Sequence, residues 1–139
     1  MPRGIFLVRS SCSDPSREEE YNRWYTHTHL PDLSKAKGFV TARRYVGVTP
    51  GGGSPTYLAA YEFDSDDITE SVKDLLRLAA AAYPKGRHID CIAGGDAQGA
   101  GPLIFEEIDP SSLKPLERLE YPTAIPDSIK QGIERLLSM

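Results

Sequence analysis

At 139 residues the chain has the length of a single domain, because two full domains of half that length would each be marginally stable. Its 40% hydrophobic and 26% charged residues are typical of a water-soluble globular protein. The net charge of −4 argues against a nucleic-acid partner, since no basic surface would offset the phosphates. The basic pair Arg43-Arg44, with Lys35 and Lys37 upstream, is too small a cluster for such a surface.

The amino-terminal segment predicts a strand rather than a targeting signal. Ile5-Phe6-Leu7-Val8 is a short apolar run, whereas a signal peptide needs about 7–15 apolar residues. No run approaches the roughly 20 apolar residues that cross a bilayer. We therefore expect a cytoplasmic protein without a membrane partner. In that compartment Cys12 and Cys91, which lack CxxC spacing, are expected to stay reduced and to pack as lone thiols.

Residues 14–29 carry the signals of a first helix. Asp14 is a favourable N-cap, Pro15 suits the first helical position, and the acidic residues 18–20 favour the positive end of the helix dipole. Pro31 disfavours helical geometry at the residue before it, so the helix is expected to end near Thr28 or His29. Four residues at helical spacing form its inward stripe: Tyr21, Trp24, Tyr25 and Thr28.

Two runs with strand composition, 39–46 and 56–63, are expected to pair as a hairpin across the glycine-rich segment 49–55. A second helix is expected to begin at Ser65-Asp66-Asp67 and to stop at Pro84-Lys85-Gly86. Its apolar residues are Ile68, Val72, Leu75, Leu76, Ala79 and Tyr83. Residues 87–102 have loop composition, and 103–108 predict a last strand.

The predicted order is β-α-β-β-α-β, which favours an α+β, ferredoxin-like antiparallel sheet with two helices on one face. We expect this domain to span residues 1–110. Residues 111–139 form a carboxy-terminal extension that ends in a short amphipathic helix with apolar residues Ile129, Ile133, Leu136 and Leu137. That helix is expected to dock, since an isolated helix of about twelve residues is marginal in water.

Two helices leave the second face of the sheet uncovered, yet both faces carry apolar side chains. In the first strand Ile5 and Leu7 point to one side, and Phe6 and Val8 to the other. An uncovered apolar sheet face is a partner site. The simplest partner is a second copy, so we predict a homodimer through the sheet face.

A motif in the first helix resembles the dimeric α/β-barrel superfamily, most closely its EthD-like and related uncharacterised branches. The motif runs from Glu19 to Leu33 and contains Trp24-Tyr25-Thr26-His27-Thr28-His29-Leu30-Pro31, followed by Gly38-Phe39-Val40 and Arg43-Arg44-Tyr45. The resemblance covers roughly residues 4–108. It implies that two sheets face each other in a barrel and that each subunit has a cleft between its sheet and its helices. Such relatives include cyclases, isomerases, cofactor-free monooxygenases and members without known activity, so the motif indicates fold more than reaction.

The helical count separates the two histidines of this motif. His29 follows Tyr21 and Tyr25 at steps of four on the flank of the inward stripe, whereas His27 follows Arg23 on the more polar side. His29 is therefore expected to reach the cleft. At a helix end the dipole favours its charged form and partial burial opposes it, so we expect a pKa near neutrality and a role as acid–base group. The alternative is that His29 caps the helix end by bonding a backbone carbonyl.

Aromatic residues complete the predicted site. Tyr61 is the candidate catalytic partner of His29, since a phenol can bond a carbonyl or enolate oxygen. The expected substrate-binding residues are Trp24, Tyr25, Tyr45 and Tyr57. The alternative is that the strand tyrosines pack their rings and leave the hydroxyl in water, and that Trp24 belongs to the core or the cleft wall.

Other chemistry is less well supported. His27, His29 and Asp32 supply two imidazoles and a carboxylate, but the histidines lie on opposite flanks of the helix, so we expect no metal site. His88 has no recognisable partner and is expected to lie on the surface. The glycine-rich segments match neither GxGxxG nor a P-loop.

Together these features predict a small enzyme that needs no cofactor. It would carry out cyclase, isomerase or related acid–base chemistry on an apolar, aromatic or polyketide-like molecule. One alternative is a non-catalytic dimeric binding or accessory protein, and a less favoured one is a cofactor-independent monooxygenase. An open cleft lined by His29 would favour the enzyme, and a filled one the binding protein.

Overall fold

The computed structural model describes residues 3–48, 55–94, 103–117 and 120–139, which fall into two compact units. The first unit carries the sheet and extends to Glu107, and the second contains Ile108–Met139.

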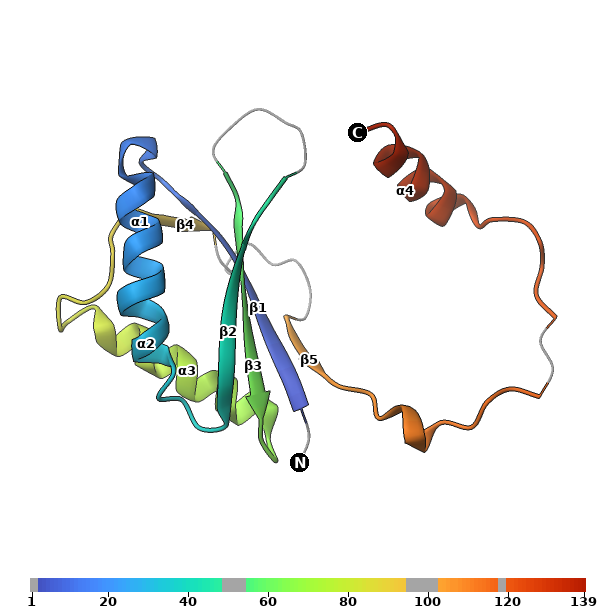
Figure 1. The fold of residues 1–139 in the computed structure, drawn as a ribbon, viewed down its shortest axis with the longest axis horizontal. Coiled ribbons are helices and arrows are strands. Elements are labelled where there is room, and N and C mark those ends of the chain that lie inside the picture. Colours follow the sequence, from blue (N-terminus) through green and yellow to red (C-terminus); the bar gives the residue numbers. More distant parts are fainter. Residues whose placement is uncertain (1–2, 49–54, 95–102, 118–119) are drawn as a thin grey trace. The chain divides into compact units, whose positions relative to one another are not determined.

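The first unit is built on one antiparallel sheet in which β1 is central (Figure 1). On one side β1 pairs with β3, which pairs with β2, and on the other side β1 pairs with β4 and β5. With the helices between β1 and β2 and between β3 and β4, this is the predicted ferredoxin-like arrangement. The strands are β1 (Arg3–Cys12), β2 (Phe39–Val46), β3 (Tyr57–Asp64), β4 (Ile92–Gly94) and β5 (Ile104–Glu106).

The last position of the sheet differs from the prediction because two short strands share it. β4 lies opposite Ser10–Cys12 and β5 lies opposite Gly4–Phe6 of β1. The expectation of a loop through 87–102 is therefore wrong for Ile92–Gly94, and the strand predicted at 103–108 is shorter. A strand of three residues is too short to give a readable alternation of apolar and polar side chains.

The first helix is longer than predicted and contains a π-helical segment. Asp14 accepts a bond from the Ser16 backbone N–H at 3.0 Å, as an N-cap should. A 3₁₀ turn (Pro15–Arg17) leads into α1 (Glu18–Trp24), the π-helical segment (Tyr25–His29) and α2 (Leu30–Leu33). The expected end near Thr28 or His29 is therefore wrong. The wider π turn carries the helix past Pro31, whose ring would clash with the carbonyl four residues earlier in a regular α-helix.

The second helix, α3 (Ile68–Ala82), begins where predicted. Asp67 is its N-cap and accepts a bond from the Glu70 backbone N–H at 3.1 Å. The buried apolar residues include Ile68, Val72 and Leu75, but Leu76 and Tyr83 are exposed and do not belong to the inward stripe. The apolar stripe is thus narrower than the sequence pattern indicates.

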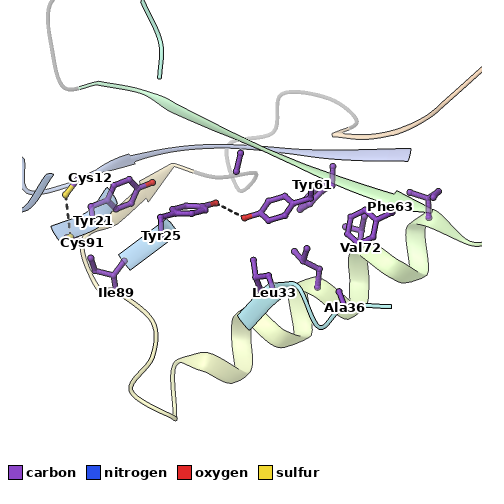
Figure 2. Packing of buried hydrophobic residues seen from close by; sticks show 14 residues of the cluster. Cys12, Tyr21, Tyr25, Leu33, Ala36, Tyr61, Phe63, Val72, Ile89 and Cys91 are labelled. Carbon is purple, nitrogen blue, oxygen red and sulfur yellow. Dashed lines mark hydrogen bonds between the residues drawn. The ribbon is translucent and has the colours of Figure 1, made fainter. Parts of the chain in front are cut away.

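All described helices of this unit cover the same face of the sheet, and the hydrophobic core fills the space between these helices and the sheet (Figures 1 and 2). Along β3 the side chains of Ala59, Tyr61 and Phe63 point into the core and alternate with more accessible neighbours.

The two cysteines meet in this core, which corrects the expectation of lone thiols (Figure 2). The sulfur atoms of Cys12 and Cys91 lie 3.4 Å apart and both side chains are buried. Burial, together with the neighbouring Cys12, raises the pKa of the Cys91 thiol to about 11, so this thiol remains protonated near neutral pH.

Among the described residues of the first unit, no helix covers the other face of the sheet. Ile5 of β1 lies opposite Phe105 of β5, Leu7 lies opposite Ala60 of β3, and Leu58 of β3 lies opposite Tyr45 of β2. Phe105 and Tyr45 are exposed, and the other side chains of this row are only partly buried. We call these residues the open sheet face. The homodimer predicted through it remains a prediction.

In the second unit the predicted amphipathic helix is present as α4 (Asp127–Leu137). Within its own unit α4 buries none of its residues, and its docking remains a prediction. In the part of the chain that the structure describes, no helix is long and apolar enough to cross a membrane.

Gly38, in the turn before β2, is expected to tolerate alanine poorly. Its φ is 77°, and an added Cβ would meet the Ser65 Cβ at 2.8 Å and the Asp64 carbonyl oxygen at 2.9 Å. Gly86 shares the positive φ, at 68°, but has open space around it. We expect Gly86→Ala to lower the unfolding free energy by about 1–2 kcal/mol and Gly38→Ala by a further 1–3 kcal/mol or so from overpacking. Urea denaturation of the two variants measures the difference, and equal losses would contradict the steric argument.

Candidate active site

The two histidines of the first helix differ in burial as the helical count predicts. His29 has 6% of its surface exposed, whereas His27 is exposed to solvent. Tyr21 and Tyr25, four residues apart on the same helical side, are fully buried. The π-helical segment therefore keeps His29 on the core side of the helix.

His29 lies in a cluster of rings that we call the histidine cluster, formed by Trp24, Tyr25, His29, Tyr83 and His88. The centroid of the His29 ring is 4.5 Å from that of the Trp24 ring, with nearly parallel planes, and 4.9 Å from that of the Tyr25 ring. The His88 ring is 5.1 Å from His29 and stacks on Tyr83 at 3.9 Å. Such distances are those of packed aromatic pairs.

His88 is the residue that the sequence reading missed. It was expected to lie alone on the surface, but it is half-buried and contacts three rings of the histidine cluster. Its Nδ1–H donates to the Ile89 carbonyl oxygen at 2.8 Å, which leaves Nε2 as the basic nitrogen of the neutral ring. No local sequence pattern predicts the contact between His88 and His29, because the two residues are far apart in the sequence.

The environment of His29 overturns the expectation of a pKa near neutrality. Burial, reinforced by His88 and by the charge of Arg44, lowers the pKa of His29 from 6.5 to about 4, and Asp32 opposes this only in part. The helix continues to Leu33, so the carbonyl end of the dipole that was expected to favour the charged form lies beyond His29. His29 is therefore a neutral imidazole at physiological pH. Its Nδ1 is buried and has no hydrogen-bond partner among the described residues, which also removes the support for a capping role through that atom.

Tyr25 connects the histidine cluster to the sheet. Its hydroxyl is 2.8 Å from the hydroxyl of Tyr61, and both side chains are buried (Figure 2). Burial, with the neighbouring Tyr25, raises the pKa of Tyr61 well above 10, so the Tyr61 hydroxyl stays protonated and can donate a hydrogen bond. The structure thus places the two candidate catalytic residues on either side of one tyrosine.

Tyr57 belongs to a more accessible polar group beside the same tyrosines. Its hydroxyl donates to a Glu18 carboxylate oxygen and accepts from the Asn22 side-chain amide at 3.1 Å. Arg44 of β2 donates to the side-chain amide oxygen of Asn22 at 2.9 Å, and its guanidinium carbon lies 4.3 Å from the centroid of the Tyr25 ring. In the sequence Arg44 belongs to a small basic pair and to the family motif, and neither pattern predicts its contact with the first helix.

Tyr45 lies apart from these residues. It is on the open sheet face, opposite Leu58, and half of its surface is exposed. The structure therefore does not bring Tyr45 together with the other aromatic residues predicted to bind substrate.

A groove of about 390 Å³ borders the histidine cluster on its solvent side. Trp24 and His88, both of which contact the His29 ring, line it together with Thr28 and Arg87. The Trp24 indole N–H donates to the Arg87 carbonyl oxygen at 2.8 Å, which fixes the Trp24 ring at the wall of the groove. His29 does not line this groove itself but lies behind two of the rings that do.

Across the described ranges, no three or more His, Cys, Asp and Glu side chains gather in a group that could hold a metal ion. The pair considered in the sequence is also split, since His29 faces the core and His27 faces solvent.

No protein-family model matches the chain, and no curated protein matches it. Among solved structures, the chain is similar to an EthD-family protein from Bacillus halodurans C-125, with 16% identity and a TM-score of 0.40. That match covers 77% of this chain and 95% of the other. A second similar structure is a protein proposed to be a monooxygenase from Shewanella loihica PV-4, with 13% identity, a TM-score of 0.43 and coverage of 78% and 98%.

An EthD-family protein is thus among the solved structures that this chain resembles, as the motif around Trp24 predicts. With TM-scores below 0.5, the two likenesses carry no inference about reaction, substrate or assembly. The ferredoxin-like fold is assigned from the strand order of the chain itself.

Proposed function

We propose that this chain is a small enzyme that works as a homodimer on an apolar organic molecule, of the aromatic or polyketide-like class, by acid–base chemistry without a cofactor. The observation that carries the proposal is the state of His29. It is a neutral, buried imidazole whose Nδ1 has no hydrogen-bond partner among the residues that the structure describes, and it lies directly behind the groove-lining rings of Trp24 and His88. A substrate group is the partner that this nitrogen lacks.

The proposed step is a proton transfer. Neutral His29 takes a proton from a carbon next to a substrate carbonyl, which forms an imidazolium and an enolate. The imidazolium then returns the proton to another atom of the substrate, so that His29 ends neutral and the substrate is isomerised or cyclised. The Tyr61 hydroxyl, which stays protonated, is assigned to the enolate oxygen as hydrogen-bond donor. Trp24, Tyr25 and Tyr57 would form the walls that hold the molecule.

A low pKa does not exclude this role, because the free protein lacks the negative charge that develops during the step. An enolate next to the imidazolium stabilises the charged form of His29 at that moment. The low pKa of the resting state ensures that the base is deprotonated when the substrate arrives.

The experiment compares His29→Ala with His27→Ala, two alanine variants of the same helix. Apolar ketones and polyketide-like compounds are screened by thermal shift, and the compounds that bind are followed for conversion by chromatography. We expect His29→Ala to lower turnover by roughly 10²–10⁴-fold and His27→Ala to leave it near wild type. His29→Gln, which retains more of the side-chain volume, separates lost chemistry from lost packing.

A non-catalytic binding protein is the second candidate, and the burial of the centre favours it. Tyr25 and Tyr61 have about 1% of their surface exposed, so protein side chains already fill the space between helix and sheet. Compounds that bind without conversion would support this alternative. A well-folded His29→Ala protein with wild-type turnover would end the catalytic proposal.

A further inference from the structure

Arg44 places a positive charge between the sheet and the first helix, against three tyrosine rings. Its guanidinium carbon lies 4.3 Å from the ring centroid of Tyr25, 5.0 Å from that of Tyr57 and 5.5 Å from that of Tyr21. The side chain is half-buried. Contacts between a cation and aromatic faces stabilise the guanidinium in part, but they do not neutralise its charge.

This charge lacks a carboxylate partner in the part of the chain that the structure describes. Arg44 donates one bond, from Nη2 to the neutral amide oxygen of Asn22, and its Nε is buried without a partner. The neighbouring carboxylate of Glu18 accepts from the Tyr57 hydroxyl. Four other arginines do form ion pairs with carboxylates: Arg17, Arg23, Arg43 and Arg87.

An unpaired guanidinium in such a place is costly. Removing a charge from water without a counter-charge is unfavourable, and partly buried charges are normally paired. Arg44 retains most of its five N–H donors, in a planar fork whose geometry matches a carboxylate. A bound anion would supply the missing counter-charge and would accept hydrogen bonds from these N–H groups.

The Arg44 charge also acts on the residues of the proposed active site. Burial has the largest effect on the pKa of His29 and lowers it, and the Arg44 charge adds to that lowering. At Tyr61 burial raises the pKa and the Arg44 charge opposes the rise. An anion bound at Arg44 would therefore lie within electrostatic reach of both groups.

We propose that Arg44 binds the carboxylate of an organic acid whose apolar or aromatic part lies against the surrounding tyrosines. This inference rests on the proposed function, since it assumes that the protein binds a small organic molecule, and it adds the chemical class of that molecule. The carboxylate would accept from the buried Nε–H, which has no acceptor among the described residues, and from an Nη–H of the same guanidinium. The tyrosine rings supply an apolar surface that favours a ring or chain over a bare inorganic anion.

The test compares carboxylates with amides of the same shape. Acetate, benzoate and 2-naphthoate are titrated against acetamide, benzamide and 2-naphthamide by protein-observed NMR at low ionic strength, where charge interactions are least screened. We expect benzoate and 2-naphthoate each to bind roughly 10-fold to 100-fold more tightly than the corresponding amide, which is the gain typical of charge-assisted hydrogen bonds. Arg44→Gln should remove this preference, and Arg44→Lys should retain part of it because the point charge remains.

Arg43→Gln is the matched control, because Arg43 precedes Arg44 in β2, lies on the opposite side of the strand and pairs with Glu62. It should keep the wild-type preference for carboxylate. A purely structural role of Arg44 would lower the melting temperature of Arg44→Gln and leave the ratio of carboxylate to amide affinity unchanged.

Three results would overturn the inference. Equal affinity of carboxylates and amides for the wild-type protein would remove the anion and leave small-molecule binding in place. A preference that survives in Arg44→Gln would place the anion elsewhere. If no carboxylate binds, Arg44 has no such ligand, and the proposed function is then judged by the separate comparison of His29→Ala with His27→Ala.

Discussion

Acidification from pH 7 to pH 4 should destabilise the wild-type protein by about 2–3 kcal/mol more than it destabilises His29→Gln. An ordinary histidine side chain has a pKa of 6.5, whereas the pKa of His29 in the folded protein is about 4. Between these values the unfolded chain binds a proton that the folded protein does not bind, so the unfolding free energy falls as the pH falls. Each pKa unit of difference corresponds to about 1.4 kcal/mol, which gives the expected magnitude.

The pH window follows from the direction of this shift. The contribution of neutral, buried His29 is complete above about pH 6.5, decreases as the pH falls towards 4 and changes little below that. The carboxylates that titrate in the same range are common to both proteins, so they cancel in the comparison. His27→Gln is the control and should follow the wild-type curve, because His27 is exposed.

The measurement is urea denaturation at a series of pH values for the three proteins. Parallel curves for wild type and His29→Gln would mean that His29 charges as easily in the folded protein as in the unfolded chain. That result would contradict the burial on which the proposed acid–base role depends.

Leu7→Asp should convert the expected dimer into a monomer. Leu7 lies on the open sheet face opposite Ala60, where a second copy would cover it. An uncompensated carboxylate buried in that interface costs roughly 3–5 kcal/mol, and a symmetric dimer would bury the change twice. The dissociation constant is then expected to rise by at least about 100-fold. Because folding and association would share this surface, the melting temperature should fall as well.

Leu76→Asp provides the same chemical change on an exposed position of α3, on the opposite side of the sheet. It should leave the oligomeric state unchanged. Light scattering coupled to size-exclusion chromatography, at micromolar protein, distinguishes these outcomes. A wild-type monomer under these conditions, or a dimer that persists in Leu7→Asp, would remove the open sheet face as the interface.

Much of the architecture could be predicted from the sequence because its causes are local. The N-caps at Asp14 and Asp67 bond groups two or three residues away, and the separation of His29 from His27 follows from spacing along one helix. The order of strands and helices follows from short-range periodicity, and with the rules of sheet connection it leads to the ferredoxin-like sheet. The uncovered face follows from the same alternation.

The features that only the tertiary structure decided depend on groups distant in sequence. His88 reaches His29 and Cys91 reaches Cys12 because the chain between α3 and β4 folds back against the first helix. The passage of that helix through Pro31 required a π turn that no residue pattern announced. The pKa of His29 depends on its burial and on the charges nearby, and whether a described carboxylate pairs with Arg44 depends on how the side chains pack, so neither is defined before the chain has folded.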